Sequence, residues 1–417
     1  MAKITSIHAR QILDSRATPT VEVTISLDTN INAVASCPSG ASVSIHEALE
    51  LRDNNRSVYG GKGVLQAVEN VNEVIGPSLI GKDPSYQNEL DLLMNKLDGT
   101  ENKTKLGANA ILPVSLALAR VSAQEQKIPL YKYLRNLTSH NDSYEQPISA
   151  FNILNGGMHA GGNIDFQEFM ILPTTKIFPK ALEQAVTIYT QLKKLLHENS
   201  FSNLLGDEGG FAPNFSKNTE ALDYLLLAIK KAGYVFQKDV EIGMDVAASS
   251  FYDDGIYNLK SESKKITPEE LLVFYKSIYE KYPLRYFEDP FYEEDFDSFA
   301  KITKTLPASC VIIGDDIIST NSTLLQKAIN AKAITGVIIK VNQIGTVTET
   351  LQVIELAKKN NIKTIISHRS GETTDDFIAD LAIAVNSDFT KFGAPARGER
   401  VVKYNRLLEI YSELHKA

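Results

Sequence analysis

The N-terminal part of the chain combines a strand-like pattern with helical ones. Apolar and polar residues alternate along TVEVTISLD (20–28), as they do in a strand with one buried face. Two further strand candidates flank it, QILDSR (11–16) and INAVASCP (31–38), and the brief connections favour an antiparallel meander. Helical spacing of apolar residues follows over three segments, residues 64–75, 86–99 and 108–126. Strands first and helices afterwards predict an α+β domain.

A change of pattern follows the polar stretch LTSHNDSYEQP (137–147). Beyond it, short apolar runs such as VEIGMD, VIIGDD and TIISH alternate with amphipathic segments, among them residues 268–282, 322–333 and 347–360. Strands that alternate with helices predict a parallel sheet, and so many units favour a closed β/α barrel. We therefore predict an N-terminal α+β domain over residues 1–138 and a barrel domain over residues 139–417.

Charged and polar side chains stand at the end of one apolar run after another. They are Asp245, Glu288 with Asp289, Asp315 with Asp316, Lys340, the triplet His368, Arg369 and Ser370, and Lys391. One such residue usually marks only the point where a strand meets solvent. In a barrel, however, the carboxyl ends of the strands converge on one face, where active sites are built. The repetition therefore predicts a functional site there.

The residue types in this set indicate metal-assisted proton abstraction. Carboxylates at the ends of three successive apolar runs, those of Asp245, of Glu288 or Asp289, and of Asp315 or Asp316, could form the oxygen-rich site that Mg²⁺ prefers. The chain lacks the His and Cys spacing of a zinc site. Lys340 would lie beside that cation, which lowers the pKa of a partly desolvated lysine. A neutral lysine can then take a proton next to a carboxylate.

The net charge and the apolar content of the chain argue against nucleic-acid and membrane partners. The formal net charge is −8, whereas nucleic-acid binding calls for basic faces. No stretch approaches the length of an apolar membrane span, and residues 1–16 lack the apolar core of a signal peptide. We expect a cytoplasmic protein without a nucleic-acid or membrane partner.

At the level of motifs, the chain resembles the enolase family along its whole length. The motifs, in family order, are ARQILDSRATPTVEV, PSGAS with HEALELRD, LDGTENKTKLGANAIL, NGGMHAGG, QEFMILP, GDEGGFAPN, FEDPF, GDD, KVNQIGT, SHRSGETTDDFIADL and GAPARGER. The resemblance implies an enolase-type barrel behind the N-terminal domain. It also implies a homodimer or a higher oligomer, and Mg²⁺-dependent, reversible dehydration of 2-phospho-D-glycerate to phosphoenolpyruvate in glycolysis and gluconeogenesis.

The resemblance also implies a role for individual residues. Lys340 matches the base that takes the C2 proton, and Glu208, supported by Glu168, matches the acid that helps the C3 hydroxyl leave. Of the two Mg²⁺ ions expected per site, the first would be bound by Asp245, Glu288 and Asp315, and the second would be completed by Ser42. Substrate contacts are implied for His159, which joins the catalytic set, and for Glu168, Glu288, Asp315, His368, Arg369, Ser370 and Lys391.

Several positions depart from the family pattern. Ala17 replaces a usual Gly in the opening motif, Val43 and Ser44 replace Thr and Gly after PSGAS, and Phe392 replaces a Thr after Lys391. The changes at Val43 and Ser44 keep open an enolase paralogue that acts on a related phosphorylated or phosphono acid. A non-catalytic binding or structural protein is a further hypothesis, which the intact set of acid, base and ligands disfavours. Because neighbouring strand residues alternate between faces, Phe392 is expected to point towards the helices.

Overall fold

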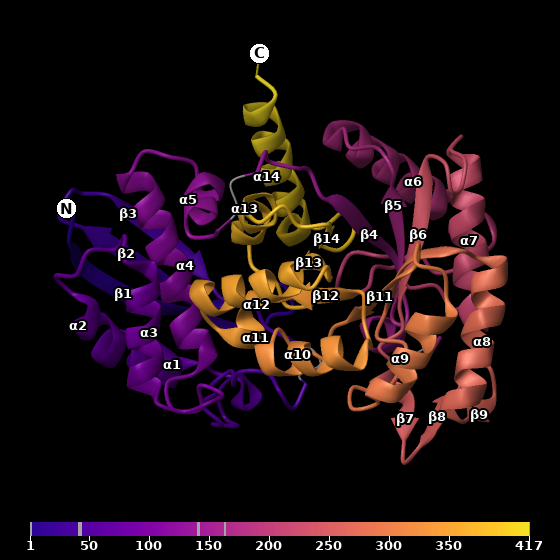
Figure 1. The fold of residues 1–417 in the computed structure, drawn as a ribbon, viewed down its shortest axis with the longest axis horizontal. Coiled ribbons are helices and arrows are strands. Elements are labelled where there is room, and N and C mark those ends of the chain that lie inside the picture. Colours follow the sequence, from indigo (N-terminus) through magenta and orange to yellow (C-terminus); the bar gives the residue numbers. More distant parts are fainter. Residues whose placement is uncertain (1, 41–43, 140–141, 162–163, 417) are drawn as a thin grey trace.

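The computed structural model describes residues 2–40, 44–139, 142–161 and 164–416. An antiparallel sheet with its helices forms one end of the molecule and a barrel forms the other (Figure 1). The sheet has the order β1 (Ile4–Leu13), β2 (Pro19–Leu27) and β3 (Asn32–Ser36). The alternating side chains Val21, Val23 and Ile25 are fully buried, and helix α4 (Ala108–Glu125) packs on the β2 and β3 strands. The predicted meander is therefore present.

The helices of this domain follow the sheet in the chain. They are η1 (Tyr59–Gly61), α1 (Leu65–Glu69), the π-helical turn η2 (Asn70–Ile75), α2 (Gly76–Leu79), α3 (Gln87–Asp98), α4 (Ala108–Glu125) and α5 (Leu130–Asn136). Of these, α1, η2, α2 and α4 pack against the sheet. The segments expected to be helical at 86–99 and 108–126 correspond to α3 and α4. The segment expected at 64–75 instead continues through Gly76 and Pro77 to Leu79. Pro77 lies at the first positions of α2, directly after the π-helical turn η2.

Eight strands close the barrel in the order β10-β11-β12-β13-β14-β4-β5-β6. They are β4 (Ile148–Asn155), β5 (Glu168–Pro173), β6 (Val240–Asp245), β10 (Leu284–Glu288), β11 (Val311–Gly314), β12 (Gly336–Ile339), β13 (Lys363–Ser367) and β14 (Phe389–Lys391). The expected all-parallel sheet is wrong in one strand, because β5 runs antiparallel to both β4 and β6. Among the described residues between β4 and β5, the structure has the 3₁₀ turn η3 (Gly157–Ala160) and no crossover helix, whereas parallel neighbours need such a crossover.

Helices surround the barrel. They are α6 (Phe178–Glu198), α7 (Asn218–Lys231), η4 (Ala248–Phe251), α8 (Pro268–Lys281), α9 (Phe296–Thr305), α10 (Ser322–Ala331), α11 (Val341–Ile344), α12 (Val347–Lys359), α13 (Phe377–Ala384) and α14 (Gly398–Leu414). A small antiparallel sheet of β7 (Tyr252–Asp253), β8 (Ile256–Leu259) and β9 (Lys264–Ile266) lies outside the barrel. The architecture confirms the predicted fold class.

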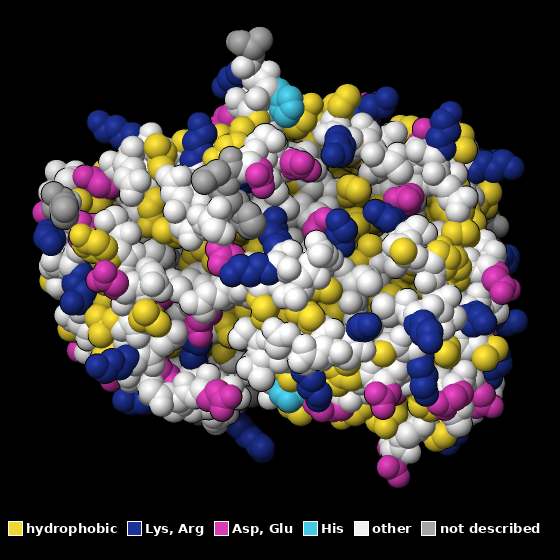
Figure 2. Space-filling model, viewed as in Figure 1, with side chains coloured by type: hydrophobic (Ala, Val, Ile, Leu, Met, Phe, Trp, Pro, Cys, Tyr) yellow, Lys and Arg dark blue, Asp and Glu magenta, His cyan; other side chains and the backbone are white. Residues whose placement is uncertain are grey.

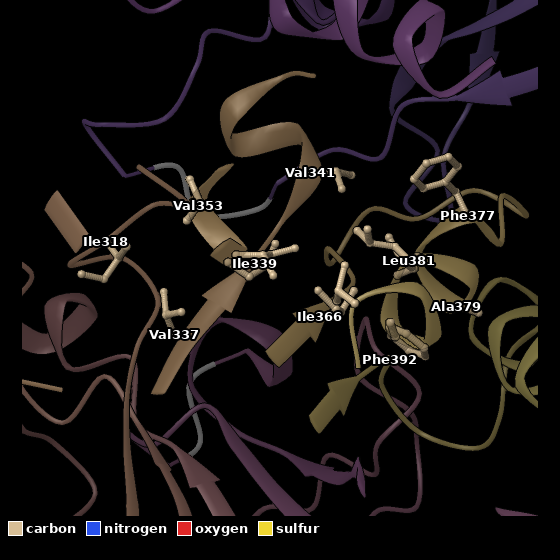
Figure 3. Close-up of a cluster of buried hydrophobic side chains, with 14 of the residues drawn as sticks. Ile318, Val337, Ile339, Val341, Val353, Ile366, Phe377, Ala379, Leu381 and Phe392 are labelled. Carbon is tan, nitrogen blue, oxygen red and sulfur yellow. The ribbon is translucent and has the colours of Figure 1, made fainter. Parts of the chain in front are cut away.

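The core lies both inside the barrel and between its strands and helices. Apolar side chains such as Met170, Ile338 and Phe389 fill the interior. The outer cluster, shown in Figure 3, contains Phe392, which is fully buried and whose ring lies 6.0 Å from that of Tyr404 on α14. Phe392 therefore points towards the helices, as predicted, and its neighbour Lys391 points the other way.

Basic and acidic side chains are interspersed on the face that Figure 2 shows. Within the described part of the chain, no helix combines the length and the apolar character needed to cross a bilayer.

Candidate active site

Three carboxylates lie side by side where three neighbouring strands meet one face of the barrel. In the strand register, Glu168 of β5 pairs with Asp245 of β6, which pairs in turn with Glu288 of β10. All three side chains are buried. Directly opposed residues on neighbouring strands have Cβ atoms only about 5 Å apart. The strand register alone therefore concentrates three acidic groups in a water-poor space.

Lys391 reaches this acidic group from the end of β14. Its Nζ lies 3.1 Å from Glu168 Oε2, 3.0 Å from Asp245 Oδ2 and 2.9 Å from Glu288 Oε1. Burial favours the neutral amine, but the surrounding carboxylates outweigh it and raise the pKa of Lys391 well above its usual value. Burial and the charge of Asp245 nevertheless raise the pKa of Glu288 to about 8. One ammonium does not balance the group, so the chemistry of these donors suits an added cation.

Asp315 and Lys340 follow the next two strands, β11 and β12. Lys340 Nζ donates a hydrogen bond to Asp315 Oδ2, while Asp315 Oδ1 is buried and has no hydrogen-bond partner among the described residues. Carboxylate oxygens of Asp289 and Asp316 lie within 4.8 Å of one another and of an Asp315 oxygen. Asp289 also accepts from the backbone N–H groups of Asp315 and Asp316, at 2.9 and 2.8 Å, so it fixes the turn that carries Asp315.

The contact between Asp315 and Lys340 controls both protonation states. Burial would raise the pKa of Asp315, but Lys340 outweighs it and the pKa of Asp315 is lowered. Burial would likewise lower the pKa of Lys340, but Asp315 outweighs it and the pKa of Lys340 is raised. The lowered lysine pKa expected beside a cation is therefore not produced by the protein's own groups.

Glu208 and His368 meet on another side of the same cavity. Glu208 Oε2 lies 3.2 Å from His368 Nε2 and accepts a hydrogen bond of 3.0 Å from Asn152 Nδ2 on β4. Burial, together with the charge of Glu208, raises the pKa of nearby Glu168 well above its usual value. Burial lowers the pKa of His368 to about 3. The pair thus consists of a carboxyl group and a neutral imidazole.

Arg369 offers a cationic group to the cavity and is itself held by the N-terminal domain. Its Nη1 donates to Glu47 Oε2 at 2.8 Å and to Asn342 Oδ1 at 3.1 Å, and its Nη2 donates to Glu47 Oε1 at 3.3 Å. Both Arg369 and Glu47 are buried. Burial would lower the pKa of Arg369, but Glu47 outweighs it, so the guanidinium stays charged. Together with the adjacent Ser370, Arg369 can bind a phosphate or carboxylate.

The structure brings most of the predicted site residues into one cavity. Its walls include Glu168, Glu208, Asp245, Asp315, Lys340, His368, Arg369, Ser370 and Lys391. Glu288 lies against it through Lys391. Ser42 falls outside the described residues, as does the side chain of His159. Strands β12 and β5 are four places apart in either direction around the barrel, so Lys340 and Glu168 face the cavity from opposite sides.

Sequence reasoning missed residues that contact the predicted site residues without being predicted site residues themselves. Glu47, Asn152 and Arg400 received no role, although each contacts a predicted site residue. Glu47 and Arg400 lie inside the quoted HEALELRD and GAPARGER motifs. No local signal in the chain distinguishes them from surface charges, and only the tertiary contacts identify them.

The fold and the cavity define a class of protein, a barrel enzyme that places a lysine and carboxylic acids on opposite sides of one cavity. Family models agree with this and make it specific. The enolase N-terminal domain matches residues 4–134, and the enolase C-terminal TIM barrel domain matches residues 143–417. The chain belongs to the enolase family, whose members are lyases of the phosphopyruvate hydratase type.

The similarity extends to a curated protein of the same family. The chain is 49% identical over 415 residues to an enolase of Methanocaldococcus jannaschii, and the match covers 99% of this chain and 96% of that protein. The family suggests a metal cofactor, and the unpartnered Asp315 Oδ1 together with the excess of buried carboxylates fits one.

Proposed function

We propose that this protein catalyses the reversible, Mg²⁺-dependent dehydration of 2-phospho-D-glycerate to phosphoenolpyruvate and water in glycolysis and gluconeogenesis. The observation that carries the proposal is the placement of Lys340 across the cavity from Glu168 and Glu208. An elimination needs a base on one side of the substrate and an acid on the other. Membership of the enolase family favours this substrate over other acids.

In this proposal, Lys340 takes the proton from C2 and Glu208 delivers a proton to the departing C3 hydroxyl. Glu168 supports Glu208, and its raised pKa is consistent with a shared proton on that side of the cavity. Arg369 and Ser370 bind the phosphate, because a guanidinium can grip two phosphate oxygens at once. His368, Lys391 and His159 complete the substrate contacts.

Two Mg²⁺ ions belong to the proposal. Asp245, Glu288 and Asp315 would hold one of them, with Ser42 completing the second site. Bound there, the metal ions would supply positive charge where the substrate carboxylate becomes more negative. A cytoplasmic homodimer or higher oligomer, and a domain boundary between residues 138 and 139, complete the assignment.

The test is the ultraviolet absorbance of phosphoenolpyruvate as it forms from 2-phosphoglycerate. We expect activity with Mg²⁺, none with EDTA, and a loss of at least about 100-fold in a Lys340→Ala variant. A Lys301→Ala variant is the matched control, because Lys301 is exposed and pairs with Glu269 on the surface. A folded wild-type protein that is inactive with Mg²⁺ would refute the assignment. Activity on a panel of phosphorylated and phosphono acids would then identify the paralogue.

A further inference from the structure

Arg400, in the first turn of α14, is fully buried, and both of its Nη atoms donate to the loops that carry the proposed site residues. Its Nη1 lies 2.7 Å from His368 Nδ1 and donates to Arg369 O at 2.5 Å. Its Nη2 donates to Ser370 O at 2.6 Å and to Asp207 O at 3.3 Å. One side chain therefore bridges the loop that carries Glu208 and the loop that carries His368, Arg369 and Ser370.

The contact between Arg400 and His368 determines which ring nitrogen of His368 carries the proton. A guanidinium has only donors, so His368 Nδ1 must accept, and in a neutral imidazole the proton then lies on Nε2. That nitrogen is 3.2 Å from Glu208 Oε2. We infer that Arg400 is a positioning residue that fixes His368 as the Nε2–H tautomer and aims this donor at Glu208 and the leaving hydroxyl. The inference rests on the proposed function for its catalytic meaning.

The electrostatics of the ring agree with this geometry. Burial lowers the pKa of His368 to about 3; Arg400 and Lys391 act in the same direction, and Glu208 opposes them. An imidazolium beside Glu208 would favour the carboxylate form and take away the proton that the acid must deliver. A neutral Nε2–H avoids this and still offers one donor, 3.2 Å from Glu208 Oε2.

The close fit around Arg400 depends on a glycine. Gly393 has φ +85°, and a Cβ there would lie 2.8 Å from Glu208 O, 3.0 Å from His368 Cε1 and 3.1 Å from Arg400 Cδ. The GAPARGER segment can thus approach the acid, the histidine and the arginine together only because position 393 has no side chain.

The tautomer can be observed directly by ¹⁵N NMR of histidine-labelled protein. The chain has seven histidines, and the His368 signals are those lost in a His368→Gln variant. We expect an unprotonated Nδ1 and a protonated Nε2 that do not change between about pH 5 and 8. An Nδ1–H tautomer, or a ring that titrates in this range, would overturn the inference.

Kinetics tests whether the contact matters for the reaction. An Arg400→Lys variant keeps the charge but cannot bond four acceptors in one fork, so we expect kcat to fall about 10- to 100-fold and His368 to populate both tautomers. Arg406→Lys is the control: it is the same change on the same helix, where Arg406 pairs with Asp380 outside the cavity, and it should leave both readouts unaltered.

A double-mutant cycle separates positioning from general support of the loop. If Arg400 acts through His368, Arg400→Lys should lower kcat by less than about threefold in a His368→Gln background. An undiminished loss there would refute the inference. An inactive wild-type protein would instead refute the proposed function, and the NMR measurement would still decide the tautomer.

Discussion

Arg120 ties the N-terminal domain to the barrel through a largely buried ion pair, and replacing it by Met tests how much this pair stabilises the protein. Arg120 Nη1 and Nη2 donate to Asp375 Oδ2 and Oδ1 at 2.6 and 2.9 Å, a bidentate contact. The Asp375 side chain is 9% exposed. Asp375 also accepts from the backbone N–H groups of Ser36 and Phe377, at 3.0 and 2.9 Å. Removing the guanidinium would leave a buried carboxylate with amide donors but no counter-ion.

The expected cost is about 3–5 kcal/mol at neutral pH, because a buried charge without its partner destabilises a fold far more than the intact pair stabilises it. The cost also depends on pH. Burial would raise the pKa of Asp375, but Arg120 outweighs it and the pKa is lowered. The pair therefore contributes stability above the unfolded pKa of about 3.9, and that contribution is lost as the pH falls through the folded value. In the variant, the two backbone hydrogen bonds still oppose burial but the guanidinium does not. The carboxyl therefore takes up a proton at a higher pH than in the wild type, and the difference in stability shrinks as the pH falls.

Urea unfolding at pH 7.5 and pH 5, followed by circular dichroism, measures this cost. The chain has no Trp but 17 Tyr, so tyrosine fluorescence gives a second probe of whether the two domains unfold together. Asp376→Asn is the control, because Asp376 also bonds Arg120, at 2.7 Å, but is 36% exposed, and it should cost less than about 1 kcal/mol. A loss below about 1 kcal/mol in Arg120→Met, or one equal at both pH values, would contradict the reasoning.

Three further predictions concern the active site. Replacing Glu47 by Gln removes the charge that holds Arg369. This variant should raise the KM for 2-phosphoglycerate about tenfold with a smaller change in kcat. An unchanged KM would show that Arg369 does not depend on the charge of Glu47. Ser44 Oγ donates to Glu293 Oε2 at 2.7 Å. The Ser44→Ala variant should lose the stabilisation from this hydrogen bond, about 1 kcal/mol, and raise the KM about fivefold in the same assay. An unaltered KM would refute this prediction. Mg²⁺ should raise the midpoint of thermal unfolding and EDTA should reverse this rise, because a bound cation offsets the excess of buried carboxylates. A midpoint that does not change on addition of Mg²⁺ would argue against the proposed metal site.

Residue patterns predicted the fold and the face of the site wherever one physical rule controls the outcome. Alternation along 20–28 predicted β2 because one face of that strand is buried. Charges at successive strand ends predicted the cavity because parallel strands in a closed barrel end on one face. The direction of β5 escaped prediction, since EFMILP is buried on both faces and its pattern is the same whichever way the strand runs.

The roles of Glu47 and Arg400 could not be predicted, for a different physical reason. Both are charged residues buried only because a partner from a distant part of the chain meets them. Glu47 contacts Arg369, which is 322 positions away in the sequence, and Arg400 contacts His368, which is 32 positions away. Charged groups are rarely buried without a partner, so composition alone favours the surface. The contact that reverses this preference exists only in the folded state.

The loop of residues 368–372 shows how these unpredicted contacts organise the predicted ones. Arg400 of α14 donates hydrogen bonds to the backbone of this loop. The N-terminal domain binds the loop as well: Ser39 N donates to Gly371 O at 2.7 Å, and Gly371 N donates to Ser39 O at 3.0 Å. A Cβ on Gly371 would lie 2.3 Å from Asp14 Oδ2 and 2.4 Å from Ser39 Oγ, so only glycine allows the two segments to meet. The barrel therefore supplies the chemical groups of the site, while the N-terminal domain and α14 together set where His368 and Arg369 stand. It follows that a barrel separated from residues 1–138 would keep most of the side chains of the proposed site but lose the contacts of Ser39 and Glu47 that hold Gly371 and Arg369.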